Sequence, residues 1–227
     1  MSKGRRIAEL TSDELSRIER PLLVVPIGSC EQHGAHLPLS TDTVIAEALA
    51  DSLASQHPRA VVAPSISITS SGEHAGFTGT LSIGREATAN TLVELVRSAD
   101  WAHDVIVVNG HGGNIAALAP AKDLLRAESR TVSVWSPRVE GADAHAGHVE
   151  TSIMLAIAPA LVRMDRAHVG NVRPLCELAD RLTVTGVRSV SPNGVLGDPR
   201  SATVDEGRRL FSLLVAELVA HATEHHP

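Results

Sequence analysis

Four short apolar runs divide the chain, and each is followed by a polar loop and then by a stretch in which apolar residues recur at helical spacing. The apolar runs cover residues 22–28, 60–68, 105–109 and 131–136. The helical stretches cover residues 41–56, 86–101, 115–129, a segment that begins near residue 149 and ends before Pro159, and residues 204–226. Continuous apolar runs are typical of strands buried on both faces. The alternation therefore predicts an α/β fold, a three-layer α/β/α sandwich around a mainly parallel central sheet.

The ends of two predicted helices carry further expectations. For the stretch 41–56 we expect the side chain of Ser40 or Thr41 to cap the first turn, because short hydroxyl side chains accept from the free N–H groups there. The stretch 204–226 ends in a polar tail with His221, His225 and His226. We expect these three histidines to be solvated.

Composition narrows the class of protein. The 227 residues suit one domain, and 43% hydrophobic against 20% charged residues predicts a chain that buries a sizeable core. A net charge of −6 offers no basic surface for nucleic acid or anionic lipid, which leaves small molecules or peptides as the expected substrates. The apolar runs are too short to cross a membrane. With two cysteines and no apolar segment in residues 1–20, we expect a single cytoplasmic domain over residues 1–227.

Ionisable residues follow every predicted strand. In parallel sheets the carboxyl ends of the strands meet at one edge, where ligands bind, so these residues should converge. Imidazole and carboxylate groups suit a dinuclear metal site for hydrolysis, with two ions about 3.5–4 Å apart. Asp42, at the start of a helix, is well placed to bridge the ions. The converging residues are Glu31 and His33 after the first strand, Glu73 and His74 after the second, His111 after the third, and His145 and Glu150 after the fourth.

Five separated segments carry a resemblance to the creatininase (creatinine amidohydrolase) family. They are EQHGAHLPLSTD at 31–42, GEHAGFTGTLS at 72–82, NGHGGN at 109–114, HAGHVETS at 145–152 and GVLGDPRSAT at 194–203, in the order that the family shows. The resemblance spans most of the chain. It implies an αβ-layered, dinuclear metal hydrolase of C–N bonds in amides or cyclic amides. It also implies a homo-oligomer, since hexamers are usual in the family.

Carried over position by position, the resemblance implies a ligand set for two divalent ions, which could be zinc, iron(II) or manganese. Its ligands would be Glu31, His33, Asp42 and His111, with Asp42 as the bridge. Creatininase itself has a metal-binding glutamate two residues after the histidine of the third-strand segment, where this chain has Gly113. Other family members share the HGGN form, and in them the glutamate of the later ETS segment looks like the replacement ligand. The resemblance therefore implies Glu150 as the fifth ligand. His145 resembles the family's general acid/base.

A second departure concerns the substrate. Creatininase has a tryptophan that closes over its small ring four residues before the histidine at 145, and here that position is Gly141. Creatinine is therefore not the expected substrate. The chain is most similar to the peptidase subgroup of the mycofactocin pathway, which implies hydrolysis of a modified precursor peptide to release its C-terminal dipeptide. The alternatives are a small-molecule amidohydrolase acting on a cyclic amide or formamide, and a non-catalytic metal-binding subunit.

Other residues near these segments remain open between a functional and a structural role. His36 either supports a metal ligand or stabilises its turn, and His74 either positions substrate or orders its loop. Gly112 and Gly113 would let the backbone approach a bound substrate closely. The GHGGN segment fits neither of the two phosphate-binding glycine motifs, so nucleotide binding is not expected. Cys30, next to Glu31, suggests a hydrolase with a cysteine nucleophile as an alternative to the metal site. We expect instead that Cys30 is a small buried thiol without a catalytic role.

Overall fold

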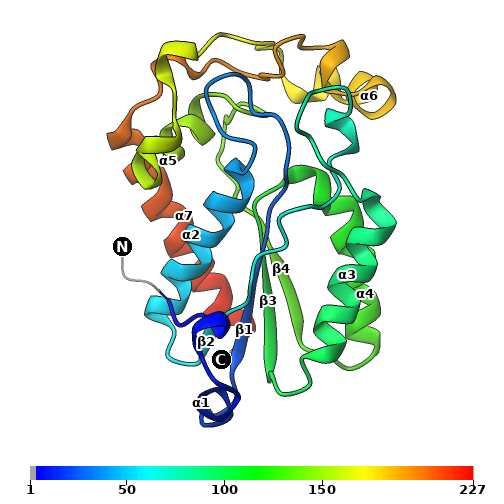
Figure 1. Cartoon of the computed structure of the whole chain (residues 1–227), viewed down its shortest axis with the longest axis vertical. Coiled ribbons are helices and arrows are strands. Elements are labelled where there is room, and N and C mark those ends of the chain that lie inside the picture. The colour runs from blue at the N-terminus through cyan, green and yellow to red at the C-terminus, as the bar shows by residue number, and fades with distance from the viewer. Residues whose placement is uncertain (1–3, 227) are drawn as a thin grey trace.

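The computed structural model describes residues 4–226 and has a central sheet of four parallel strands (Figure 1). The strands are β1 (Leu22–Ile27), β2 (Ala60–Val62), β3 (Asp104–Asn109) and β4 (Val132–Trp135). Their order in the sheet is β2-β1-β3-β4, with Leu22 of β1 paired to Ala60 of β2 and to Asp104 of β3. Every pairing in this sheet is parallel, and parallel neighbours need crossover connections, which helices supply here.

Helices cover both faces of the sheet, so the predicted three-layer α/β/α sandwich is confirmed. The helices α3 and α4 lie on one face, and α2, α5 and α7 lie on the other (Figure 1). The short α1 and the helix α6 lie beyond opposite ends of the strands (Figure 1). The bounds are α1 Ser12–Ser16, α2 Thr41–Gln56, α3 Gly84–Ser98, α4 Ile115–Ala127, α5 His148–Ile157, α6 Leu175–Thr185 and α7 Val204–His225.

Alternate residues of each strand enter separate cores on the two faces. In β1, Leu22 and Val24 pack among side chains of α2, α5 and α7, whereas Leu23 and Val25 pack among those of α3 and α4. Successive side chains of a strand point to opposite faces, so a strand covered on both faces must be apolar at every position. All six residues of β1 are buried, which explains its uninterrupted apolar run.

The structure corrects three boundary details. The second strand ends at Val62, not at residue 68, because Pro64 has no N–H to donate to the ladder; only an isolated bridge joins Ile66 to Ile27 further on. The stretch predicted as a helix over 86–101 is α3, which begins at Gly84 and ends at Ser98. Neither expected hydroxyl caps α2: Ser40 makes no capping hydrogen bond, and Thr41 Oγ1 donates to the carbonyl of Pro38.

The C-terminal histidines differ from the expectation in two cases. His221 is half-buried, and its Nε2 is buried without a hydrogen-bond partner among the described residues. The side chain of His226 is buried, and its Nε2 lies 2.7 Å from Ser133 Oγ of β4. The end of α7 therefore returns to the sheet, which a local polar pattern does not reveal. Over residues 4–226, no helix has the length and apolar content that a membrane crossing requires.

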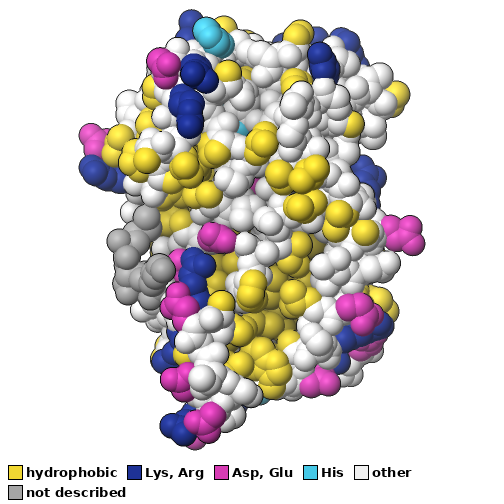
Figure 2. Space-filling view, viewed as in Figure 1, with side chains coloured by type: hydrophobic (Ala, Val, Ile, Leu, Met, Phe, Trp, Pro, Cys, Tyr) yellow, Lys and Arg dark blue, Asp and Glu magenta, His cyan; other side chains and the backbone are white. Residues whose placement is uncertain are grey.

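The loops that follow the strands gather at one end of the molecule, above the carboxyl ends of β1 and β3 in Figure 1. On the face shown in Figure 2, basic and acidic side chains are interspersed around a central apolar region. No continuous basic area is visible on this face.

Candidate metal centre

Five residues predicted as ligands meet at the carboxyl edge of the sheet. Three come from the segment around β1 and α2, one from the turn after β3, and one from the first turn of α5. All five have their ligand atoms in groups in which every pair lies within 4.8 Å. They are Glu31, His33, Asp42, His111 and Glu150.

The five residues form two groups of three that share one member. Glu31, Asp42 and His111 make the first group, and His33, Asp42 and Glu150 make the second. Glu31 and His33 are two residues apart in the chain and fall on opposite sides of Asp42 in these two groups, although both also belong to a further group with His145. A shared carboxylate between two ligand groups is the arrangement that two neighbouring metal ions require.

The two oxygens of Asp42 face different histidines. Oδ1 lies 2.9 Å from His33 Nε2, and Oδ2 lies 3.0 Å from His111 Nδ1. Ser29 Oγ also donates to Oδ2 over 2.8 Å. Burial works against the ionised form, but the two histidines hold the pKa of Asp42 well below its usual value. Asp42 therefore stands as an ionised carboxylate between the groups, in the first turn of α2 where the helix dipole also favours negative charge.

Backbone carbonyls select the tautomers of both histidines. A carbonyl oxygen only accepts, so the ring nitrogen beside it must carry the proton. His33 Nδ1 donates to the carbonyl of Glu31 over 3.1 Å, and His111 Nε2 donates to the carbonyl of Ser70 over 3.0 Å. The remaining nitrogens, His33 Nε2 and His111 Nδ1, are the ones that face Asp42. Burial works against the charged rings, but Asp42 raises the pKa of His33 to about 9, and Asp42 and Glu73 raise the pKa of His111 well above its usual value. These two nitrogens therefore carry protons beside the shared carboxylate, and a metal ion that binds there would displace them.

The carboxylate of Glu31 is the strongest sign that a cation belongs in this site. Its side chain is fully buried, and within residues 4–226 neither oxygen makes a hydrogen bond of ordinary geometry. The nearest nitrogens are His111 Nε2, 3.2 Å from Oε2, and His74 Nε2, 3.3 Å from Oε1. Burial, and next the charge of Asp42, raise the pKa of Glu31 to about 8. A buried carboxylate without donors is costly, and a divalent ion would compensate it.

The first turn of α5 holds Glu150 in the second group. Its Oε2 accepts from the backbone N–H of Ala146 over 2.6 Å and lies 3.9 Å from His33 Nε2. Asp143 accepts from the N–H groups of His148 and Val149, which fixes the first turn of the helix. Burial raises the pKa of Glu150 to about 7, with His33 acting in the opposite direction. The side chain is therefore directed into the site by local hydrogen bonds.

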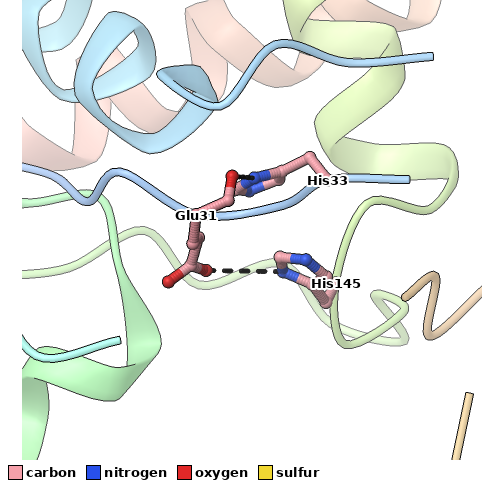
Figure 3. A group of neighbouring side chains, drawn as sticks. All are labelled: Glu31, His33 and His145. Atoms are coloured by element: carbon pink, nitrogen blue, oxygen red, sulfur yellow. Dashed lines mark hydrogen bonds and ion pairs between the residues drawn. The ribbon is translucent and has the colours of Figure 1, made fainter. Parts of the chain in front are cut away.

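His145 lies against Glu31 and His33 (Figure 3). Its ring centroid is 4.3 Å from that of His33, and its Nδ1 is 3.9 Å from Glu31 Oε1. The other nitrogen, Nε2, donates to the backbone carbonyl of Gln32 over 2.8 Å. Burial, and next the charge of His33, hold the pKa of His145 well below its usual value. The ring is thus neutral, with an unprotonated Nδ1 facing the carboxylate of Glu31.

The two histidines left open by the sequence have different surroundings. His36 is buried, and its Nε2 lies 2.9 Å from Thr151 Oγ1 in α5, so it joins the loop after β1 to the helix that carries Glu150. His74 lies on the site itself, within 3.3 Å of Glu31 Oε1. Burial lowers the pKa of both rings to about 4, so both are neutral at physiological pH.

Two further residues at the site were not among the predicted ligands or support residues. Glu73 Oε1 lies 3.3 Å from His111 Nε2, and the amide of Gln32 contacts His74. A Cβ at Gly113 would fall 2.0 Å from Glu73 Oε1, so this glycine leaves the space that the Glu73 carboxylate fills. Gly112, by contrast, has open space around its missing Cβ among the described residues. Glu73 was expected at this edge because it follows the second strand, but it was given no role there.

A cavity of about 180 Å³ opens onto the centre, lined by Glu31, Glu73, His74, His111 and His145 among others. A second cavity, of about 710 Å³, shares Ala144, Leu175 and Leu196 with the first. Gly141 lines the second cavity, and no atom of the described residues lies within 4 Å of the place of its Cβ. The second cavity is therefore open at Gly141, and a larger side chain at this position would narrow it.

Cys30 does not match the buried thiol expected from the sequence. It is half-buried, and its Sγ lies 3.7 Å from the carbonyl of Gly79, on the side of the loop that leads to Leu81. It is also absent from the described residues that line the cavity over the centre. The alternation after β1 places Glu31 inward and Cys30 outward, so a nucleophilic role for this thiol has no support in the geometry.

Comparison with known proteins gives a family match over nearly the whole chain. The family model described as creatininase, creatinine amidohydrolase, matches residues 8–222. The chain is 50% identical over 202 residues to a mycofactocin precursor peptide peptidase from Mycolicibacterium smegmatis, covering 86% of this chain and 81% of that protein. It is 47% identical over 216 residues to the protein of the same name from Mycobacterium ulcerans, covering 91% and 86%.

Creatininases are more distant relatives with the same fold. A creatinine amidohydrolase from Pseudomonas putida is 27% identical over 261 residues, covering 100% of this chain and 99% of that protein. A crystal structure of creatinine amidohydrolase superposes with a TM-score of 0.84 at 24% identity, covering all of both chains. A creatininase mutant described as the Zn-Zn type gives the same TM-score, identity and coverage. The common fold therefore extends over the whole length.

Proposed function

Because this chain belongs to the creatininase family, we propose that it is a dinuclear metal-dependent peptidase that hydrolyses a modified mycofactocin precursor peptide and releases a C-terminal, dipeptide-derived product. The observation that carries the proposal is the pair of ligand groups sharing Asp42. Identity of 46–50% to four mycofactocin precursor peptide peptidases, against 27% to a creatinine amidohydrolase, supports the peptide as substrate. The wide cavity at Gly141 is consistent with a substrate longer than creatinine.

In this proposal, Glu31, Asp42 and His111 would hold one ion, and His33, Asp42 and Glu150 the other. Zinc, iron(II) and manganese all suit imidazole and carboxylate ligands. When bound, the ions would supply an acidified water and a polarised amide carbonyl. We also propose that residues 1–227 act as one domain and assemble as a hexamer, as family resemblance implies; residues 1–3 and 227 lie outside the described part of that range.

His145 is proposed as the residue that moves the proton. Its Nε2 is engaged by the carbonyl of Gln32, so only Nδ1 is free to accept one, and that atom faces the centre. Water adds its oxygen to the amide carbon while Nδ1 takes the released proton. Nδ1 then returns the proton to the nitrogen as the C–N bond breaks, so that the amine leaves neutral.

The substrate is tested by incubating the metal-loaded protein with the modified precursor peptide, creatinine and a formamide in parallel, and by following products with mass spectrometry. We expect release of the dipeptide-derived product and no turnover of creatinine. Turnover of a small amide alone would replace the peptidase by a small-molecule amidohydrolase. Two bound ions without hydrolysis of any of the three would favour a non-catalytic metal-binding subunit.

Replacing His145 tests its role separately. His145→Ala should lower kcat by roughly 10²–10⁴-fold, the usual contribution of a positioned acid/base, while both ions remain bound. Measuring kcat together with metal content decides the matter, since His145 also lies in a ligand group with Glu31 and His33. Loss of an ion from this variant would make His145 a ligand and refute the proton-transfer role. His225→Asn, on the exposed end of α7, is the matched control.

A further inference from the structure

Gln32, between the proposed ligands Glu31 and His33, has every polar atom of its amide in contact. The side chain is 5% exposed, and its Oε1 accepts from the backbone N–H of Gly34 over 2.9 Å. Its Nε2 has three close neighbours: His74 Nδ1 at 2.9 Å, the carbonyl of Gly194 at 3.0 Å and His145 Nε2 at 3.1 Å. An amide nitrogen has two hydrogens and only donates, so one of these three contacts is not a hydrogen bond.

The surroundings of His145 identify that contact. His145 Nε2 gives its own proton to the backbone carbonyl of Gln32 over 2.8 Å, so it cannot accept from the amide. The two amide hydrogens therefore go to the carbonyl of Gly194 and to His74 Nδ1. Since His74 Nδ1 accepts, the proton of this neutral ring is on Nε2.

The proton on His74 Nε2 lies beside a proposed metal ligand, although the contact does not have the alignment of a hydrogen bond. His74 Nε2 lies 3.3 Å from Glu31 Oε1, and both side chains are buried. The other carboxylate oxygen, Oε2, lies on the side of His111, in the group that contains Asp42. A chain of contacts thus runs from Gly194 through Gln32 and His74 to one oxygen of Glu31.

We propose that Gln32 and His74 are positioning residues that hold the Glu31 carboxylate for metal binding, with His74 presenting an N–H to Oε1 and leaving Oε2 for the ion. This inference rests on the metal site of the proposed function. Partners of this kind fix the orientation of a ligand, and their removal typically lowers metal affinity 10–100-fold. The inference gives His74 a defined task in place of the two roles that the sequence left open.

The same series of contacts explains how the segment 194–203 takes part in the site. Gly194 has φ +81°, and a Cβ there would fall 1.8 Å from Gln32 Oε1. Only glycine combines this backbone conformation with so close an approach. The carbonyl of Gly194 can then accept from the Gln32 amide, which joins a segment 162 residues away to the centre.

Gln32→Glu tests the inference because it keeps the shape of the side chain and removes its NH₂ group. We expect Zn²⁺ affinity, measured by competition with a chromophoric chelator, to fall 10–100-fold. In the metal-free protein, ¹⁵N NMR of labelled histidine should show His74 protonated only on Nε2, and in the variant also on Nδ1, beside the new carboxylate. Gln56→Glu on α2 is the control, since Gln56 is exposed and is the only other glutamine in the chain.

Two substitutions of His74 decide the question even if Gln32→Glu does not fold. His74→Gln keeps an N–H within reach of Glu31, so Zn²⁺ affinity should stay within a few-fold of the parent. His74→Leu removes the donor and should lower it 10–100-fold. Equal affinities for these two variants would overturn the inference. These measurements need no substrate. Failure of the peptidase assay would therefore remove the proposed function without affecting the inference that Gln32 and His74 position Glu31.

Discussion

Removing the metal ions with a chelator is expected to abolish hydrolysis of the precursor peptide, and adding back a divalent ion should restore it. The physical reason is that the buried Glu31 carboxylate and the two ligand groups around Asp42 would hold the ions that lower the pKa of the attacking water. The measurement is peptide turnover beside elemental analysis, with two ions per chain expected in the active protein. Full activity in protein shown to be metal-free would refute the proposal.

Metal affinity should also depend on pH. The pKa of Glu31 is raised to about 8 and that of Glu150 to about 7, chiefly by burial. Carboxyl groups with raised pKa values hold protons at neutral pH, and an ion must displace those protons in order to bind. Burial works against the charged ring of His33, but Asp42 raises its pKa to about 9, so this ligand must also lose a proton. Affinity is therefore expected to fall as the pH is lowered from about 9 to about 6, with protons released on binding. Titration at several pH values, with buffers of different ionisation enthalpy, measures both effects.

Asp42→Asn is the substitution with the largest expected effect. Asparagine keeps the size of the side chain but offers one neutral oxygen and an NH₂ group, so it cannot serve two ions from opposite oxygens. We expect the protein to lose at least one ion and turnover to fall by about 10³-fold or more, the equivalent of about 4 kcal/mol in the transition state. Metal content and kcat are measured together.

A matched control for this substitution lies on the same helix. Asp51 of α2 pairs with Arg6, away from the centre, so Asp51→Asn should keep both ions and full turnover. Thermal unfolding of both variants separates loss of the site from loss of the fold. Two bound ions and normal turnover in Asp42→Asn would remove the bridging role from Asp42.

The local pattern of apolar residues was sufficient to predict most strands and helices, because a strand buried on both faces is apolar at every consecutive position. The run 22–28 and the stretch 41–56 agree with β1 and α2 to within one residue. The helix α6 was not predicted, although Leu175, Leu178 and Leu182 recur at helical spacing in it, and most of its residues are exposed. The second strand was predicted too long because apolar residues continue beyond Pro64 after the regular ladder has ended.

By itself, the sequence determined which residues reach the carboxyl edge of the sheet, because a parallel strand carries the residues that follow it to that edge. Glu31, His33 and His111 are found there for this reason alone. Only the tertiary structure decided what each group does at the edge. The tautomers of three histidines depend on the carbonyls of Glu31, Gln32 and Ser70, and the task of His74 depends on an amide that also reaches Gly194. Apart from the local contact of His33 with Glu31, these hydrogen bonds join residues 41 to 162 positions apart. Such contacts leave no periodic trace in the chain, since they arise only when packing brings the segments together.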